Sequence, residues 1–332
     1  MSRISLALAA SILLMSCKDD DKATAFTGTT KVTANSVSPP ANLPALTAAD
    51  AKEHLSSLGS SPIDQVSLTS LLLQSSGQED EEDPATGGPG EEDPATGDSD
   101  KPVSDPDPIG TGPSNICFET QVEDLKLKAV GDTISVDSSV DIGSCLATYY
   151  KNLGASEVKI EKAAYGFYFE TSCAGGDYSA ANGKNLKDAE AIFDSDCKST
   201  ISNLSSTVFT LKGSITVQGQ VIKFDNESTT AISKADGTPC TITLANGVRT
   251  ENGCVEVTRT VNAIDPAENF FQKSTSNNLT WTEATPGNYF ESGSLSVVVN
   301  NWKGTITYSG ASTPPTYSIT DGTSTETGTL VY

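Results

Sequence analysis

Aromatic residues are distributed very unevenly along this chain, and their distribution limits where a folded core can form. Only Phe26, of 21 aromatic residues, precedes Ser114. Residues 1–113 also carry 18 acidic residues against 6 basic ones. A segment that lacks aromatic side chains and has a high net charge buries too little apolar surface to offset the entropy lost on ordering. The sequence therefore predicts a long, largely disordered acidic tether over 17–113 and a folded unit over 114–332.

The predicted tether contains an acidic tandem repeat. The heptapeptide Glu-Glu-Asp-Pro-Ala-Thr-Gly occupies residues 81–87 and recurs at 91–97. It offers no apolar side chain that could face a core, and its like charges repel one another. The repeat is typical of an extended spacer between an anchor and a domain.

Two short helices are predicted within the tether. Thr47 and Asp50 have the spacing of a capping box at the start of a helix over 47–58. A proline at the first helical position starts the second helix, over 62–73. Each helix could dock on the folded unit, form transiently, or bind a partner.

The first 16 residues have the pattern of a signal peptide. Arg3 supplies a positive charge, and residues 4–15 form an apolar stretch of 12 residues. That stretch is shorter than the roughly 20 residues that a membrane-spanning helix needs. The run Leu14-Met15-Ser16-Cys17 resembles the lipobox of bacterial lipoproteins, although Met15 is larger than the residue usual at its position.

This resemblance implies that Cys17 is acylated, so that the lipid bilayer of the outer membrane is the chain's first partner. Acyl chains bury at about 0.8 kcal/mol per CH₂ group, and two or three of them anchor a protein stably. The following Lys18-Asp19-Asp20 resembles a signal for lipoprotein export to the cell surface. We therefore expect a surface-exposed lipoprotein. A periplasm-facing anchor and an ordinary cleaved signal are the alternatives.

The folded unit is predicted to be mainly β with some α. We expect an α+β segment over 114–204, followed by an antiparallel β-sandwich or barrel over 205–332, as two domains or as one. Gln218-Gly219, Asn246-Gly247 and Asn252-Gly253 predict hairpin turns, and Asp321-Gly322 precedes a last strand. Helical spacing of apolar residues predicts helices over 140–153 and 185–193.

Six cysteines remain once Cys17 is assigned to the lipid. An even number of cysteines in an exported chain predicts three disulfides. The first expected bridge joins Cys240 to Cys254, because these two flank the Asn-Gly turn. The other two expected bridges are Cys117–Cys145 and Cys173–Cys197. A zinc site is the rival interpretation, but the chain lacks paired CxxC spacing and the predicted folded unit lacks histidine.

Few catalytic groups can be recognised in the predicted folded unit. The only histidine, His54, lies in the predicted tether, where it is expected to face solvent. A catalytic nucleophile that depends on histidine therefore has no base, and we expect no metal and no cofactor. The net charge of −22 argues against nucleic acid as a partner. The sequence leaves open whether the chain is an enzyme and favours a non-enzyme.

Paired carboxylates leave one catalytic alternative, because glycosidases need only two acids at a suitable separation. Solvent-exposed acids are the competing interpretation of every pair. Aromatic residues of the C-terminal β region could pack in a core or offer a surface to carbohydrate. The candidate pairs are Glu157 with Glu161, Asp194 with Asp196, and Glu251 with Glu256, and the aromatic residues are Trp281, Tyr289, Trp302, Tyr308 and Tyr317.

The sequence thus favours a membrane-anchored lipoprotein that presents a disulfide-braced, β-rich binding or adhesion module to a protein or glycan partner. A periplasm-facing lipoprotein of envelope structure or assembly is the first alternative. An exported polysaccharide hydrolase that uses two carboxylates is the second.

Replacing Cys17 with serine should move the protein from the membrane fraction to the soluble fraction, because no acyl chain can then be attached. The wild-type protein should incorporate labelled palmitate and the variant should not. Unchanged membrane association, together with an unlabelled wild-type protein, would contradict the lipoprotein prediction.

Overall fold

The computed structural model describes residues 31–56, 58, 125–185, 188–189, 191–193, 197, 199–282 and 289–330. Several sequence predictions fall outside these residues. They are the signal peptide, Cys17, Cys117, the acidic repeat, the helix over 62–73 and the pair Asp194 with Asp196.

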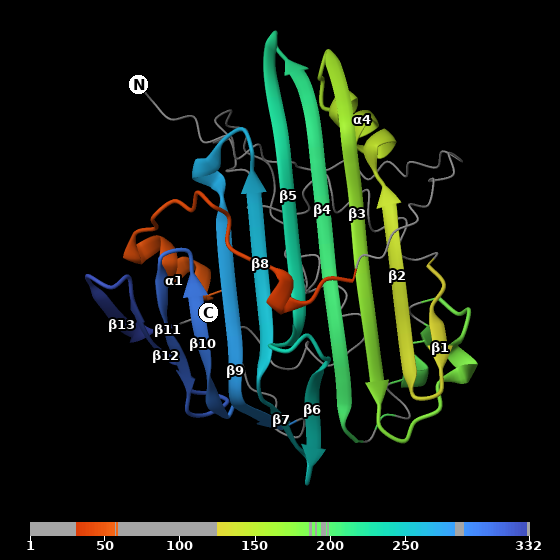
Figure 1. Cartoon of the computed structure of the whole chain (residues 1–332), viewed down its shortest axis with the longest axis vertical. Coiled ribbons are helices and arrows are strands. Elements are labelled where there is room, and N and C mark those ends of the chain that lie inside the picture. Colours follow the sequence, from red (N-terminus) through yellow and green to blue (C-terminus); the bar gives the residue numbers. More distant parts are fainter. Residues whose placement is uncertain are drawn as a thin grey trace, which may run out of the picture.

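Within the described residues, thirteen antiparallel strands form a single large sheet (Figure 1). This architecture confirms the predicted mainly β, antiparallel class. Strands β1 and β13 are the two edges of the sheet. The strands are β1 Lys128–Val130, β2 Thr133–Asp141, β3 Glu157–Cys173, β4 Ile201–Val217, β5 Gln220–Lys234, β6 Cys240–Ala245, β7 Val248–Glu251, β8 Cys254–Asn262, β9 Phe270–Thr282, β10 Ser292–Val299, β11 Trp302–Tyr308, β12 Thr316–Thr320 and β13 Thr325–Thr329.

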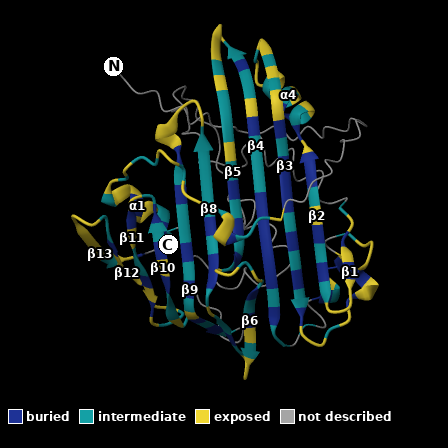
Figure 2. Ribbon diagram, viewed as in Figure 1, coloured by how far each residue is buried: buried dark blue, intermediate teal, exposed yellow. Residues whose placement is uncertain are grey.

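The predicted division at residue 204 falls inside strand β4. This strand pairs with β3 along nearly its whole length and with β5 from Ser205 onward. The two predicted segments therefore share one hydrogen-bonded sheet. The ends of β4 and β5 away from the turn lie in the interior, whereas their hairpin tip is exposed (Figure 2).

Two of the predicted hairpin turns are confirmed, whereas Asn252-Gly253 joins β7 to β8, which do not pair with each other. Gln218 and Gly219 join β4 to β5 with φ angles of 51° and 78°. Asn246 and Gly247 join β6 to β7 with φ angles of 54° and 77°. Two-residue turns of this type require positive φ at both positions, which asparagine and glycine tolerate best.

The first predicted helix is present but shorter. Helix α4 spans Gly143–Asn152, because residues up to Asp141 pair with β3 as the end of β2. Leu146 of α4 is fully buried in a small cluster with Ala163 and Leu211. The second predicted helix, over 185–193, lies only partly within the described residues.

The sheet divides into two branches between β4 and β9 and closes again. The upper branch runs β4-β5-β8-β9, and the lower branch runs β4-β6-β7-β9. The branches separate along β4, where Ser205 pairs with β5 and Asn203 pairs with Cys240 of β6. Strand β9 likewise pairs with β8 through Thr275 and with β7 from Leu279 onward.

The tether prediction is wrong for residues 31–56, which lie against the sheet and are called the strap below. The strap includes the short helix η1 Ala34–Ser36 and helix α1 Ala48–Ser56, which lies within the range predicted for the first tether helix. It runs across the front of the sheet in Figure 1, over the middle of β8 and near one end of β9.

The strap contacts both faces of the sheet. Ala34 packs in a cluster with Val257 and Phe271 on one face. Ala51 and Leu55 are fully buried on the other face, in the main core. Successive residues of a strand point to opposite faces. Phe271 of β9 accordingly packs in the cluster of Ala34 on one face, and Phe270 packs against the main core, with Ala51 and Leu55, on the other.

Side chains of the sheet hold the strap by its backbone. The amides of Val32 and Ala34 donate to the hydroxyl oxygens of Ser206 and Ser233, each at 2.9 Å. Further along the strap, its backbone forms hydrogen bonds with four side chains at one end of the sheet. They are Asn269 Nδ2 to the Asn42 carbonyl, Asn300 Nδ2 to that of Pro44, Trp302 Nε1 to that of Leu46, and Asn301 Oδ1 to the Leu46 amide, at 2.8–3.0 Å.

Composition could not reveal this docking. The strap has no aromatic residue, but it fills gaps in a core whose aromatic side chains come from elsewhere in the chain. His54, expected to face solvent, instead lies with its ring 4.5 Å from that of Phe270. The only histidine therefore belongs to the folded unit.

Asn300→Gly should loosen the strap. Asn300 has a φ of 48°, which glycine adopts freely, so the substitution removes only the bonds to the Pro44 carbonyl and the Phe271 amide. At about 1 kcal/mol per bond, unfolding in urea should report a loss of about 2 kcal/mol. Protease cleavage within residues 31–56 should also become faster.

Asn278→Gly is the matched control, because Asn278 is exposed and has a similar φ of 51°. Its side chain makes no contact with the strap. Equal losses of stability in the two variants would mean that Asn300 does not hold the strap.

Candidate functional site

A cavity of about 60 Å³ lies where the two branches of the sheet separate. Residues from both branches line it, together with Leu58, which follows the strap. Polar and apolar side chains divide the lining almost evenly. The polar group is Asn203, Cys240, Glu251, Cys254, Glu256, Ser274 and Ser276, and the apolar group is Leu58, Ile232, Ile242, Leu279, Phe290 and Leu295.

Each branch contributes one thiol to the cavity. Cys240 begins β6 of the lower branch and Cys254 begins β8 of the upper branch. Both are buried free thiols, so the predicted Cys240–Cys254 bridge is not present. The Cys240 thiol donates a hydrogen bond to Cys254, and this bond and burial raise the pKa of Cys240.

The prediction of that bridge failed because it assumed that the Asn-Gly turn brings the two cysteines together on paired strands. The turn does join β6 to β7, but after β7 the chain crosses to the other branch. Strand β8 therefore pairs with β5 and β9, and β6 pairs with β4 and β7.

Three other described cysteines are in disulfides. Cys173, at the end of β3, is bonded to Cys197 with an S–S distance of 2.04 Å, as the sequence predicted. Cys145 of α4 is also in a disulfide. Its expected partner, Cys117, lies outside the described residues.

The two branches also bring together one of the predicted carboxylate pairs. Glu251 ends β7 and Glu256 lies in β8, and both line the cavity. Burial raises the pKa of each carboxyl, and the charge of Glu251 raises that of Glu256 further. Ser276 and Cys254 donate hydrogen bonds to Glu251, which partly offset its burial.

Glu256 has no such compensation. Among the residues that the structure describes, no lysine or arginine pairs with it and no side chain donates a hydrogen bond to it. A carboxyl group in low-dielectric surroundings without partners favours its neutral form. Such groups are concentrated at functional sites.

Asn203 is a second group without a partner. The residue is 6% exposed, and its Oδ1 accepts no hydrogen bond from the residues that the structure describes. Asn203 lies on β4 at the point where the branches separate, directly opposite Cys240. An unpaired buried acceptor costs about 1–3 kcal/mol, so its retention requires an explanation.

The other sequence candidates do not gather at this cavity. Glu157 and Glu161 are exposed on β3, where Glu161 lies 3.4 Å from Lys159. The described residues hold no group of three or more His, Cys, Asp or Glu side chains that could bind a metal ion. The five aromatic residues considered for carbohydrate binding are all buried and pack in the core: Trp281, Tyr289, Trp302, Tyr308 and Tyr317.

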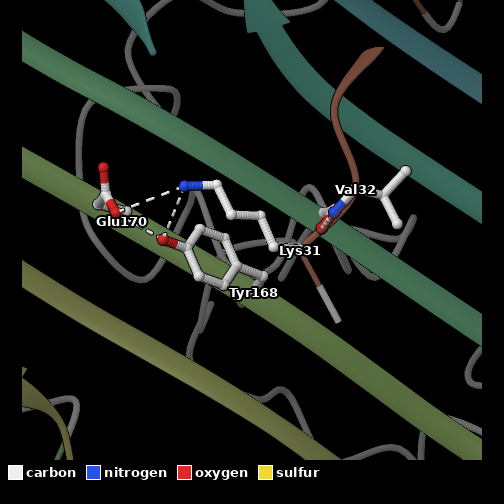
Figure 3. Close-up of polar contacts among 5 residues, drawn as sticks. Lys31, Val32, Tyr168 and Glu170 are labelled. Carbon is white, nitrogen blue, oxygen red and sulfur yellow. Dashed lines mark hydrogen bonds and ion pairs between the residues drawn. The ribbon is translucent and has the colours of Figure 1, made fainter. Parts of the chain in front are cut away.

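A separate polar cluster holds the start of the strap (Figure 3). Lys31 Nζ donates to the Tyr168 hydroxyl at 3.2 Å and lies 3.8 Å from Glu170 Oε2. Tyr168 in turn donates to Glu170 at 2.5 Å, and burial and this bond raise the pKa of Tyr168. The cluster fastens the strap to β3 on the face away from the cavity.

No family model, curated protein or solved structure matches this chain. The helices of the described part are all too short or too polar to cross a bilayer. The site is therefore interpreted from its own geometry. The sequence signal for it was the pairing of Glu251 with Glu256, because the alternation of Val255, Glu256 and Val257 in a strand by itself predicts an acid that faces solvent.

Glu256→Gln should stabilise the protein at neutral pH. Burial raises the pKa of Glu256 in the folded state above its value in the unfolded chain. As the pH rises above the unfolded pKa, the unfolded state releases this proton more readily than the folded state does, so the folded state loses stability. The variant should exceed the wild type by roughly 1 kcal/mol at pH 7 in urea unfolding. The difference should vanish near pH 4.

Glu227→Gln is the control, because Glu227 forms an ion pair with Arg259 at 2.7 Å and lies outside the cavity. It should not stabilise the protein at any pH. A loss of stability at pH 7 in Glu256→Gln would show that the charged carboxylate has a compensating partner.

Proposed function

We propose that this chain is an outer-membrane lipoprotein, anchored through Cys17, whose disulfide-braced sheet serves as a binding module on the cell surface. The anchor rests on the lipobox resemblance and the surface location on Lys18-Asp19-Asp20. The binding role rests on the cavity, where Asn203 Oδ1 accepts no hydrogen bond and Glu256 forms no ion pair among the residues that the structure describes.

Polysaccharide hydrolysis is less well supported, although Glu251 and Glu256 do share a cavity. A glycosidase needs room for a sugar ring and, in inverting enzymes, a water between its carboxyl groups. A cavity of about 60 Å³ accommodates only about five water-sized positions. The aromatic residues that could stack on a sugar pack in the core instead.

The strap shortens the distance that can separate the sheet from the membrane anchor. Only residues 18–30 separate Cys17 from Lys31, where docking begins. An extended chain of that length spans at most about 50 Å, so the sheet stays close to the membrane.

The acidic repeat is then not a spacer between anchor and sheet. Leu58 and Leu125, which lie on either side of the repeat in sequence, both pack against the main core. The repeat therefore lies in a segment whose two flanking residues, Leu58 and Leu125, belong to the same folded unit.

Recognition sites for a sequence-specific protease, inserted one at a time, test this proposal on intact cells. A site within residues 18–30 should let added protease release the whole sheet into the medium. A site between the two repeats, at 88–90, should be cut without release, because the strap stays docked. Reducing, denaturing electrophoresis should then show two fragments in the membrane fraction.

Each outcome has a distinct meaning. Release from the 88–90 site would show that residues 31–56 do not hold the sheet to the anchor. Cleavage at 18–30 only after the outer membrane is permeabilised would support the periplasm-facing alternative. Continued membrane association after complete cleavage at 18–30 would contradict attachment through Cys17.

A further inference from the structure

The polar wall of the cavity contains hydrogen-bond acceptors that no described side chain satisfies. Asn203 Oδ1 accepts no bond from the described residues, and the Glu256 carboxyl receives none from a described side chain. Of the donors in the wall, Cys240 is engaged with Cys254, and Cys254 and Ser276 with Glu251, whereas the hydroxyl of Ser274 lies on β9 opposite Glu256. A ligand that donates hydrogen bonds would satisfy the acceptors of Asn203 and Glu256.

The same wall carries uncompensated acidity. Glu251 and Glu256 lie close enough for the charge of one to raise the pKa of the other. No ion pair among the described residues involves either of them. A bound cation would relieve both the burial of these carboxyls and their mutual repulsion.

The rest of the lining restricts the size and shape of that cation. One water molecule occupies roughly 10–15 Å³ of such a cavity. A cavity of about 60 Å³ therefore holds about five non-hydrogen atoms. Ile232, Ile242 and Phe290 supply an apolar wall that would favour a short hydrocarbon stem.

We propose that the cavity binds a small primary amine in its ammonium form, with the ammonium group directed to Asn203 and Glu256 and the alkyl stem against the apolar wall. This inference rests on the binding role proposed above and names the ligand class of that site. An ammonium group supplies three donors and one positive charge, which matches the acceptors and the acidity of the wall.

A metal ion fits this site less well. Hard cations such as Ca²⁺ take six to eight oxygen ligands, and zinc takes four ligands in tetrahedral array. Within the described part of the chain, no three acidic, thiol or imidazole side chains converge on one point. The thiol of Cys240 also holds its proton strongly, because it donates to Cys254 in buried surroundings.

Thermal unfolding of the detergent-solubilised full-length protein tests the proposal, with methylammonium, ethylammonium and tetramethylammonium chloride as probes at constant ionic strength. Methylammonium and ethylammonium should raise the melting temperature in a saturable manner, by about 2 °C or more at saturation, because they bind only the folded state. Tetramethylammonium has the same charge but no donor and should have no effect beyond that of potassium chloride.

Glu256→Gln should weaken methylammonium binding at least tenfold, as the saturation midpoint measures, because it removes the charge that the ammonium group pairs with. The variant is expected to fold, since it replaces an uncompensated acid with a neutral group of the same shape. Glu227→Gln, outside the cavity, should bind methylammonium like the wild type.

Three results would overturn the proposal. They are no shift with either primary amine, an equal shift with tetramethylammonium, and an unchanged midpoint in Glu256→Gln. A saturable shift with Ca²⁺ or Zn²⁺ alone would assign the cavity to a metal ion instead. The protease-release assay measures anchoring independently, so negative titrations with normal release would remove the ligand and leave the anchored module in place.

Discussion

The hydrogen bonds between sheet side chains and the strap backbone are the interaction on which the rest of this structure depends. Ser206 and Ser233 bind the strap on one face, and Asn300 and Trp302 bind it where it crosses to the other. Because these bonds reach backbone atoms, they place few demands on the strap's side chains. Small apolar residues then fill the space between the strap and an aromatic core. The strap thereby joins both faces of the sheet and brings Leu58 to the cavity wall.

The cavity is a consequence of the divided sheet. Strands that pair continuously leave no interior space between them, whereas the separation of β5 from β6 along β4 opens a gap lined by side chains of both branches. Each branch contributes a thiol and a carboxyl to it. Burial disfavours the charge on Glu251 and Glu256, and Cys254 and Ser276 donate hydrogen bonds to Glu251. The unpaired acceptor of Asn203 completes a wall that is complementary to a donating cation.

Local chemistry in the sequence predicted local structure well. The turns at Gln218-Gly219 and Asn246-Gly247 depend on residues that tolerate positive φ, and both formed as predicted. The Cys173–Cys197 bridge was also predicted correctly. Docking of the helix over 47–58 was one of three possibilities that the sequence left open, and the structure shows that it docks. What depends on distant pairing could not be predicted. The branches of the sheet and the separate strands of Cys240 and Cys254 follow from contacts between residues far apart in sequence. Glu251 and Glu256 were named as one pair among three, and only the fold distinguishes them.

Hydrogen exchange at the backbone amides of Val32, Ala34 and Leu46 tests most directly whether the strap is part of the folded unit. Each of these amides donates to a side chain of the sheet. Amides bonded within a stable structure exchange only when that structure opens, whereas amides of a solvated tether exchange at the rate of an unfolded peptide. If the strap is docked, these three amides exchange as slowly as amides in the centre of β5. Exchange at unfolded-peptide rates, with β5 still protected, would contradict the account.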